Sequence, residues 1–173
     1  MADPVLNKYL LFSLGEEHYG IPIAKVQEVV RYIPITRLHD TSRFLKGVVN
    51  LRGRIVPIID LRLKFGFEER PYTDRTVFIV VEVLSPRSPY LVGLAVDAVE
   101  DVVEIPDTRV EKMPSVGGKM KSHYLYGLVQ LDDRLVLLLN LEEILSTEEV
   151  VKISEKVEPQ KVSPEPSPSQ RKG

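Results

Sequence analysis

Hydrophobic residues along the chain gather in short runs that glycine, proline and polar residues interrupt. Two such runs, 48–51 and 54–59, flank Arg52 and Gly53, and strand-forming residues on both sides of a two-residue turn predict a β-hairpin. Pro57 lies inside the second run and has no N–H for a strand ladder, so we expect it at a sheet edge, a bulge or a barrel corner. Further strands are predicted at 9–14, 18–21, 28–32, 76–83, 90–96, 124–131 and 135–139. Short strands with frequent turns favour small barrels over a parallel sheet.

Helical periodicity is confined to short segments next to the predicted strands. After Pro22, apolar residues recur at helical spacing for two turns. Asp60 is a suitable N-cap for one or two turns that end at Gly66, and Asn140 is a suitable cap for a final helix over 141–145. These segments predict a mainly β protein with a few short helices.

Two blocks of the first half of the chain recur, in the same order, in the second half. Residues 20–30 align with 93–103, and residues 47–61 align with 127–141. Strand sequences rich in Val and Leu resemble one another by chance, but agreement of two separate blocks favours a duplication. We therefore expect two pseudo-symmetric β lobes, each a small barrel with a short helix and a terminal hairpin.

The net charge of -2 conceals an uneven distribution of charge along the chain. Residues 23–67 contain nine Lys and Arg against three Asp and Glu, whereas residues 68–158 contain ten against eighteen. If the two segments build different lobes, the lobes differ in charge; ordinary solvation of the surface explains the distribution equally well. The predicted hairpin tips show the same contrast, since Arg52 in the first repeat corresponds to Asp132 in the second.

Residues suited to catalysis are sparse. The absence of Cys removes thiolate nucleophiles, disulfides and cysteine zinc sites, and the 3 His have no metal-ligand spacing. We therefore expect no enzymatic activity, no cofactor and no bound metal. Nucleic-acid binding is a weaker alternative: residues 23–67 are basic and contain Tyr32 and Phe44, but pairs of exposed aromatic residues for base stacking are lacking.

The ends of the chain add expectations about location and order. No signal peptide and no run of roughly 20 apolar residues is present, so we expect a cytoplasmic protein without a membrane-spanning helix. Residues 153–173 are rich in Pro and Ser and nearly devoid of apolar side chains, which predicts a disordered tail. The fold is expected to occupy residues 1–152.

Five segments resemble the CheW family of chemotaxis coupling proteins: 12–29, 44–62, 92–102, 124–128 and 134–141. The most specific motif is N-L-R-G-R-I-V-P-I, which begins at Asn50, and the resemblance extends over about residues 7–147. It implies two five-stranded SH3-like β-barrels with short helices. It also implies a non-enzymatic adaptor that joins the histidine kinase CheA to the cytoplasmic tips of chemoreceptors. An adaptor of a parallel kinase pathway, controlling motility or development, is the alternative.

The resemblance further implies which residues contact a receptor. These positions are Val26, Glu28, Gly47, Asn50, Arg52 and Val99. Arg52 can make paired hydrogen bonds to a carboxylate or a backbone carbonyl. Glu28 could instead pair with Arg52 within the protein and position it, and Gly47 and Asn50 could be purely structural.

Contacts with the regulatory domain of the kinase are implied at Lys46 and Ile55. A second kinase contact is implied at Glu111 and Val116, where the family more often has an arginine and a larger apolar residue. The isolated protein is expected to be a monomer that binds neither nucleic acid nor membrane.

Overall fold

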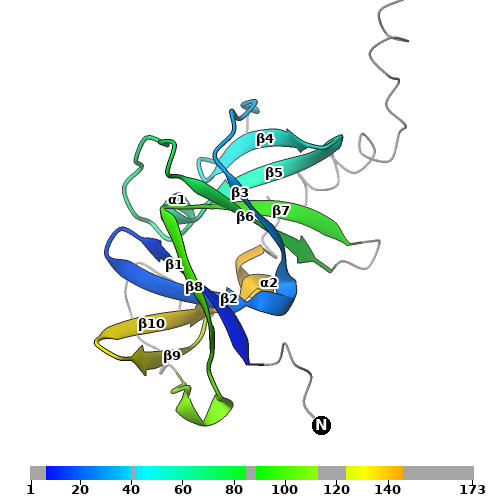
Figure 1. The fold of residues 1–173 in the computed structure, drawn as a ribbon. Coiled ribbons are helices and arrows are strands. Elements are labelled where there is room, and N and C mark those ends of the chain that lie inside the picture. The colour runs from blue at the N-terminus through cyan, green and yellow to red at the C-terminus, as the bar shows by residue number, and fades with distance from the viewer. Residues whose placement is uncertain (1–6, 40–41, 85–88, 113–123, 146–173) are drawn as a thin grey trace, which may run out of the picture.

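The computed structural model describes residues 7–39, 42–84, 89–112 and 124–145, and these residues are mainly β-strand (Figure 1). Its elements are, in chain order, β1 (Lys8–Leu14), β2 (Glu17–Pro22), η1 (Ile23–Lys25), β3 (Val26–Arg31), β4 (Leu45–Leu51), β5 (Arg54–Asp60), α1 (Leu61–Lys64), β6 (Val77–Val83), β7 (Tyr90–Val96), β8 (Ala98–Glu104), η2 (Asp107–Arg109), β9 (Leu125–Leu131), β10 (Arg134–Leu139) and α2 (Leu141–Leu145). The predicted mainly β fold is confirmed. None of the described helices is long and apolar enough to span a membrane. The predicted tail, 153–173, lies outside the described residues.

The helix predicted after Pro22 is wrong in extent. It is the single 3-10 turn η1, and Val26 already begins β3. The reason is tertiary: Val29 and Val30 pair with Ile79 and Phe78 of β6, and this pairing outweighs the local helical spacing.

The described strands form two five-stranded sheets that exchange a hairpin between the halves of the chain (Figure 1). One sheet has the order β3-β6-β7-β5-β4 and the other the order β8-β1-β2-β10-β9. In each sheet, a hairpin from one half of the chain lies between two strands of the other half. In the first sheet, β6 is antiparallel to β3 and β7 is parallel to β5. In the second sheet, β1 is antiparallel to β8 and β2 is parallel to β10. The pseudo-symmetry is therefore complete at the level of strand order. The idea that continuous segments build separate lobes is wrong, because the acidic segment supplies β6 and β7 to the sheet that contains β3 to β5.

The two sheets nevertheless differ in charge. The described residues of 23–96, which contain β3 to β7, include eleven Lys and Arg against six Asp and Glu. The remaining described residues, 7–22 and 97–145, include four against twelve. We call the first unit the basic lobe and the second the acidic lobe. The two lobes therefore differ in charge as the sequence suggested, but the residue ranges that form them differ from the two segments first compared.

Each sheet is closed by a matching backbone bridge. In the basic lobe, Thr36 and Val48 each donate an N–H to the carbonyl of the other, at 2.8 Å in both directions. In the acidic lobe, Glu111 and Leu128 do the same, also at 2.8 Å. Thr36 follows β3 and Val48 lies in β4, and these are the two edge strands of their sheet. The bridges therefore close both sheets into small barrels, as the resemblance implies.

Pro57 lies at a place in β5 where its missing N–H is tolerated. It is opposite Val48 of β4 on one side. On the other side, pairing with β7 begins only at Ile58. β5 is an interior strand, so Pro57 is not on an edge strand as one of the predicted alternatives had it; it stands just before the pairing with β7 begins, where its missing N–H is tolerated.

Apolar side chains fill the interior of each barrel and the space between the barrels. Separate clusters occupy the basic lobe and the acidic lobe, and a third, larger cluster combines strands of both sheets with α1 and α2. Tyr19 is fully buried in this central cluster and packs against Phe12 and Phe65, with ring centroids 5.7 Å away in each case. Burial of apolar surface contributes roughly 25 cal/mol per Å² to folding, so the central cluster holds the two lobes together.

Candidate partner-binding site

The tip of the β4–β5 hairpin is fixed by its own strand and by β3. Arg52 and Gly53 have φ values of 52° and 88°, the left-handed conformation that a tight hairpin turn requires. Asn50 accepts a hydrogen bond from the Gly53 N–H at 2.8 Å, and Arg52 donates one to the carboxylate of Glu28 in β3. Since β3 and β4 are opposite edges of the sheet, the Glu28–Arg52 ion pair joins the two edges of the barrel. The internal pairing considered from the sequence is confirmed.

Arg52 remains open to a partner despite this ion pair. Its side chain is 72% exposed, whereas that of Glu28 is 32% exposed. An ion pair this exposed contributes only about 0–1 kcal/mol to stability. A guanidinium has five N–H donors, and Glu28 engages one of its nitrogens, so several donors still face solvent. Glu28 therefore positions Arg52 more than it stabilises the fold.

Two of the implied receptor residues support the shape of the hairpin. Gly47 has a φ of 146°, and a Cβ at this position would lie 2.1 Å from the carbonyl oxygen of Thr36. No side chain fits there, because the Thr36 bridge that closes the barrel occupies the space. Asn50 has an exposed side chain, but its oxygen is bound to the turn. Asn50 is also directly opposite Ile55 of β5, so an implied receptor residue and an implied kinase residue are cross-strand neighbours.

Val26 and Val99 are equivalent positions of the repeat, in β3 and β8. Both are half-buried and pack against the central cluster. Val26 follows Lys25, which forms an ion pair with Glu142 of α2. Val99 comes after Asp97, whose partner is Arg62 of α1, and Figure 1 shows β3 beginning beside α2 and β8 beginning beside α1. The two valines therefore lie at the beginning of equivalent strands and share the central cluster as their packing partner.

The implied kinase residues are spread over three places. Ile55 is half-buried against the central cluster, near the hairpin tip. Lys46 is only 14% exposed; it forms an ion pair with Glu69, and its Nζ lies 5.6 Å from the centre of the Tyr72 ring. Glu111 is exposed in the acidic lobe, where its backbone closes the barrel. Val116 lies outside the described residues.

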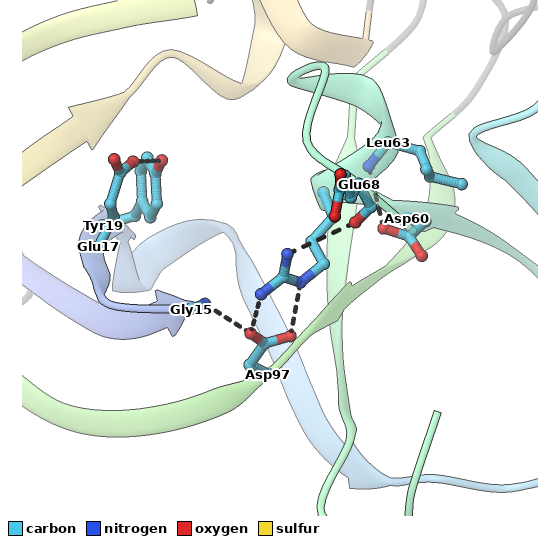
Figure 2. Close-up of polar contacts among 8 residues, drawn as sticks. Gly15, Glu17, Tyr19, Asp60, Leu63, Glu68 and Asp97 are labelled. Carbon is cyan, nitrogen blue, oxygen red and sulfur yellow. Dashed lines mark hydrogen bonds and ion pairs between the residues drawn. The ribbon is translucent and has the colours of Figure 1, made fainter. Parts of the chain in front are cut away.

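A polar contact that the sequence did not reveal connects the two lobes (Figure 2). Asp97, in the link from β7 to β8, accepts hydrogen bonds from Arg62 Nε at 3.2 Å and Nη2 at 2.8 Å, and from the Gly15 N–H at 2.5 Å. Arg62 is in α1 of the basic lobe, and Gly15 is in the β1–β2 turn of the acidic lobe. Burial alone would raise the pKa of Asp97, but the hydrogen bonds from Arg62 and Gly15 and the charge of Arg62 outweigh it and lower this pKa.

A second unpredicted network lies on the acidic lobe. The carboxylate of Glu100 in β8 contacts His18 Nδ1 at 2.7 Å and accepts a hydrogen bond from Arg134 Nη1 at 2.9 Å. His18 is in β2 and Arg134 in β10, so the network crosses four adjacent strands. Sequence patterns contain no signal for such contacts, because the partners are far apart in the chain and meet only through the exchanged hairpins.

Comparison with known proteins agrees with this architecture. The CheW-like domain family model matches residues 8–149. The chain is 41% identical over 149 residues to Chemotaxis protein CheW of Klebsiella aerogenes, covering 86% of this chain and 87% of that protein. It is 33% identical over 138 residues to Chemotaxis protein CheW of Helicobacter pylori, covering 80% and 81%. The crystal structure of scaffolding protein TtCheW from Thermoanaerobacter tengcongensis has a TM-score of 0.74 and 34% identity, covering 85% of this chain and 92% of that one.

A family match over most of the chain and relatives at 41% and 33% identity establish the family, and the two closed five-stranded sheets agree with it. The chain belongs to the CheW family and is a non-enzymatic coupling adaptor of chemotaxis.

Proposed function

We propose that one copy of this protein, in the cytoplasm, joins the cytoplasmic tip of a chemoreceptor to the regulatory domain of the histidine kinase CheA. The observation that carries this proposal is the tip of the β4–β5 hairpin, where Arg52 is oriented by Glu28 and still largely exposed. An arginine held in this way can donate paired hydrogen bonds to a carboxylate or to carbonyls at the end of a receptor helical hairpin. Family membership supports both partners.

The proposed receptor surface consists of Arg52, Glu28 and the neighbouring Val26. Val26 is half-buried and offers an apolar contact beside α2. Gly47 and Asn50 act indirectly, since they hold the hairpin and its turn in shape. Val99 is the equivalent position in β8, packs against the same central cluster as Val26, and would add a further apolar contact.

The proposed kinase surface starts on the same hairpin. Ile55 is the cross-strand neighbour of Asn50, so a kinase bound at Ile55 would adjoin a receptor bound at Arg52. Lys46 extends this surface along β4. Glu111 and Val116 would supply a second kinase contact from the acidic lobe. The shared hairpin gives a direct route by which one bound partner can affect the other.

The test uses the purified full-length chain, a receptor-tip fragment and the kinase regulatory domain, with light scattering on a sizing column. We expect the chain alone to elute as a monomer and all three proteins to elute together. Arg52→Asp should weaken receptor binding at least about tenfold, because hydrogen bonds to a charged group contribute roughly 1.5–3 kcal/mol, and should leave kinase binding unchanged. Ile55→Ser should do the reverse, with thermal melting to confirm its folding.

Asp132→Ala is the matched control. Asp132 occupies the corresponding turn position of the β9–β10 hairpin and has a φ of 53°, close to that of Arg52. We expect this variant to bind both partners normally. Normal binding of both partners by Arg52→Asp and Ile55→Ser would contradict the proposed surfaces.

A further inference from the structure

A groove of about 560 Å³ opens on the basic lobe at the end of β4 that is remote from the hairpin tip. The lining residues that matter here are Tyr32, Arg37, Lys46, Glu69, Arg70 and Tyr72. They come from the segment after β3, from β4 and from the connection between α1 and β6. The groove is large enough for the side chains of a few residues of a bound peptide.

The groove has an excess of positive charge around one carboxylate. Glu69 forms an ion pair with Lys46 and approaches Arg43 at 3.6 Å. The hydrogen bond from Lys46, its charge, and the charges of Arg43 and Arg37 lower the pKa of Glu69. Arg37 and Arg70 are exposed, and within the described part of the chain neither has a carboxylate within ion-pair distance. Lys46, Arg43 and Arg37 therefore act on the Glu69 carboxylate, and Arg70 adds a further cation to the lining of the groove.

The aromatic residues of the groove pack against one another. The Tyr32 ring meets the Tyr72 and Phe78 rings edge-on, at interplanar angles of 72° and 61°. The Tyr72 hydroxyl donates a hydrogen bond to the buried carboxylate of Asp60 at 2.7 Å, which fixes its ring. Base stacking needs free ring faces, and the Lys46 ammonium already lies over the Tyr72 ring, 5.6 Å from its centre. The same groove suits an acidic peptide, because each arginine or lysine side chain can bind a separate carboxylate.

We propose that this groove binds an acidic segment of a partner protein through Arg37, Lys46 and Arg70, and that Glu69 occupies it when the partner is absent. The inference rests on the proposed function in one respect: Lys46 belongs to the proposed kinase surface, so the acidic segment is assigned to the kinase regulatory domain. Glu69 then competes with the incoming carboxylates for Lys46.

The probe is a fluorescein-labelled hexaglutamate peptide, and its binding to the full-length chain is measured by fluorescence anisotropy. We expect binding that weakens as salt increases, no binding of labelled hexaglutamine, and weaker binding of oligothymidylate of equal charge. Arg37→Gln and Arg70→Gln should each weaken hexaglutamate binding about two- to fivefold, the range for an exposed ion pair. Lys112→Gln is the matched control: Lys112 is an exposed cation that lies over Tyr126 in the acidic lobe, and its loss should change nothing.

Glu69→Gln is the decisive variant. If Glu69 competes with the peptide, its removal frees Lys46 and strengthens hexaglutamate binding about two- to fivefold. If Glu69 only supports the groove, its removal weakens binding, and that result overturns its role as an occupant. The acidic-peptide site is overturned if Arg37→Gln and Arg70→Gln bind hexaglutamate as tightly as the wild-type chain does. It is also overturned if oligothymidylate binds more tightly than hexaglutamate.

The kinase regulatory domain is tested separately against the same variants. Weaker kinase binding by Arg37→Gln and Arg70→Gln supports the assignment of the acidic segment to the kinase. If these variants bind hexaglutamate weakly but the kinase normally, the groove stands and its assignment to the kinase is overturned. If hexaglutamate does not bind while Ile55→Ser still weakens kinase binding, the groove proposal fails and the proposed function stands.

Discussion

Replacing Asp97 with alanine tests how strongly the contact between the lobes stabilises the fold. The change removes three hydrogen bonds, two from Arg62 and one from the Gly15 N–H. Arg62 is only 10% exposed and would keep one long contact, at 3.5 Å, to the carbonyl oxygen of Glu68. The substitution therefore leaves a nearly buried guanidinium without its counter-charge.

The magnitude follows from the burial of the two partners. Breaking a buried ion pair costs roughly 3–5 kcal/mol, whereas an exposed pair contributes about 0–1 kcal/mol. Asp97 is 34% exposed and Arg62 is 10% exposed, so this pair lies between the two limits. We expect Asp97→Ala to lower the free energy of unfolding by about 2–3 kcal/mol.

Urea unfolding of the full-length chain measures this loss, and a double-mutant cycle with Arg62→Met isolates the interaction. We expect a coupling energy of at least about 1.5 kcal/mol between Asp97 and Arg62. Asp97→Asn, which keeps one acceptor oxygen but no charge, should be less destabilising than Asp97→Ala. A loss below about 0.5 kcal/mol for Asp97→Ala, or additive single mutants, would refute the reasoning.

The pH dependence gives a second measure of the same contact. The pKa of Asp97 is lowered in the folded protein, so its contribution is complete above the unfolded value of about 3.9 and is lost as the pH falls through the lower, folded pKa. The wild-type chain should therefore lose stability more steeply below about pH 4 than Asp97→Asn. Parallel pH profiles for the two proteins would contradict this account.

Three further substitutions test the barrel and the groove. Gly47→Ala should cost about 3 kcal/mol or more in urea unfolding, because the added Cβ would lie 2.1 Å from the Thr36 carbonyl oxygen. Gly53→Ala should cost only about 1–2 kcal/mol, since no atom lies within 4 Å of an added Cβ and the penalty is that of the positive φ alone; equal losses for the two glycines would contradict the steric argument. Tyr72→Phe should lower stability by about 1–2 kcal/mol in thermal unfolding, because it removes the hydrogen bond to buried Asp60, and an unchanged melting temperature would show that this bond is dispensable.

The features that the sequence predicts well are local. The hairpin turn at Arg52 and Gly53 is visible from two residues and their flanking strands, and the structure has it at that position. The repeat predicts two related lobes, because equivalent blocks in the same order require equivalent strands. The partner of each hairpin is not predictable in this way. The pattern of apolar and polar residues in β1 and β2 suits pairing with strands of their own half of the chain as well as pairing with β8 and β10. Only contacts formed in the folded protein determine which strands they pair with.

In the candidate site, too, local features were predictable from the sequence and long-range contacts were not. The Glu28–Arg52 ion pair could be considered beforehand because both residues belong to segments singled out by the sequence. The groove could not, because Lys46 and Glu69 meet across a connection that has no regular pattern. The Arg62–Asp97 contact was also hidden, since it depends on α1 and the β7–β8 link lying side by side. Long-range polar contacts of this kind follow from topology and not from composition.

The exchanged hairpins bear on how such a protein could arise. In a chain containing only the counterparts of β1 to β5, the β1–β2 hairpin could lie between β3 and β5 of its own chain or between the same two strands of a second copy. Two copies of that chain could form a symmetric, domain-swapped dimer in which each copy inserts its hairpin between the strands of the other. Duplication and fusion of the gene would then have joined the two subunits of that dimer into one chain. Each half of the gene could afterwards acquire substitutions independently of the other. In a dimer of identical chains both tips must be the same, whereas here one carries Arg52 and the other Asp132.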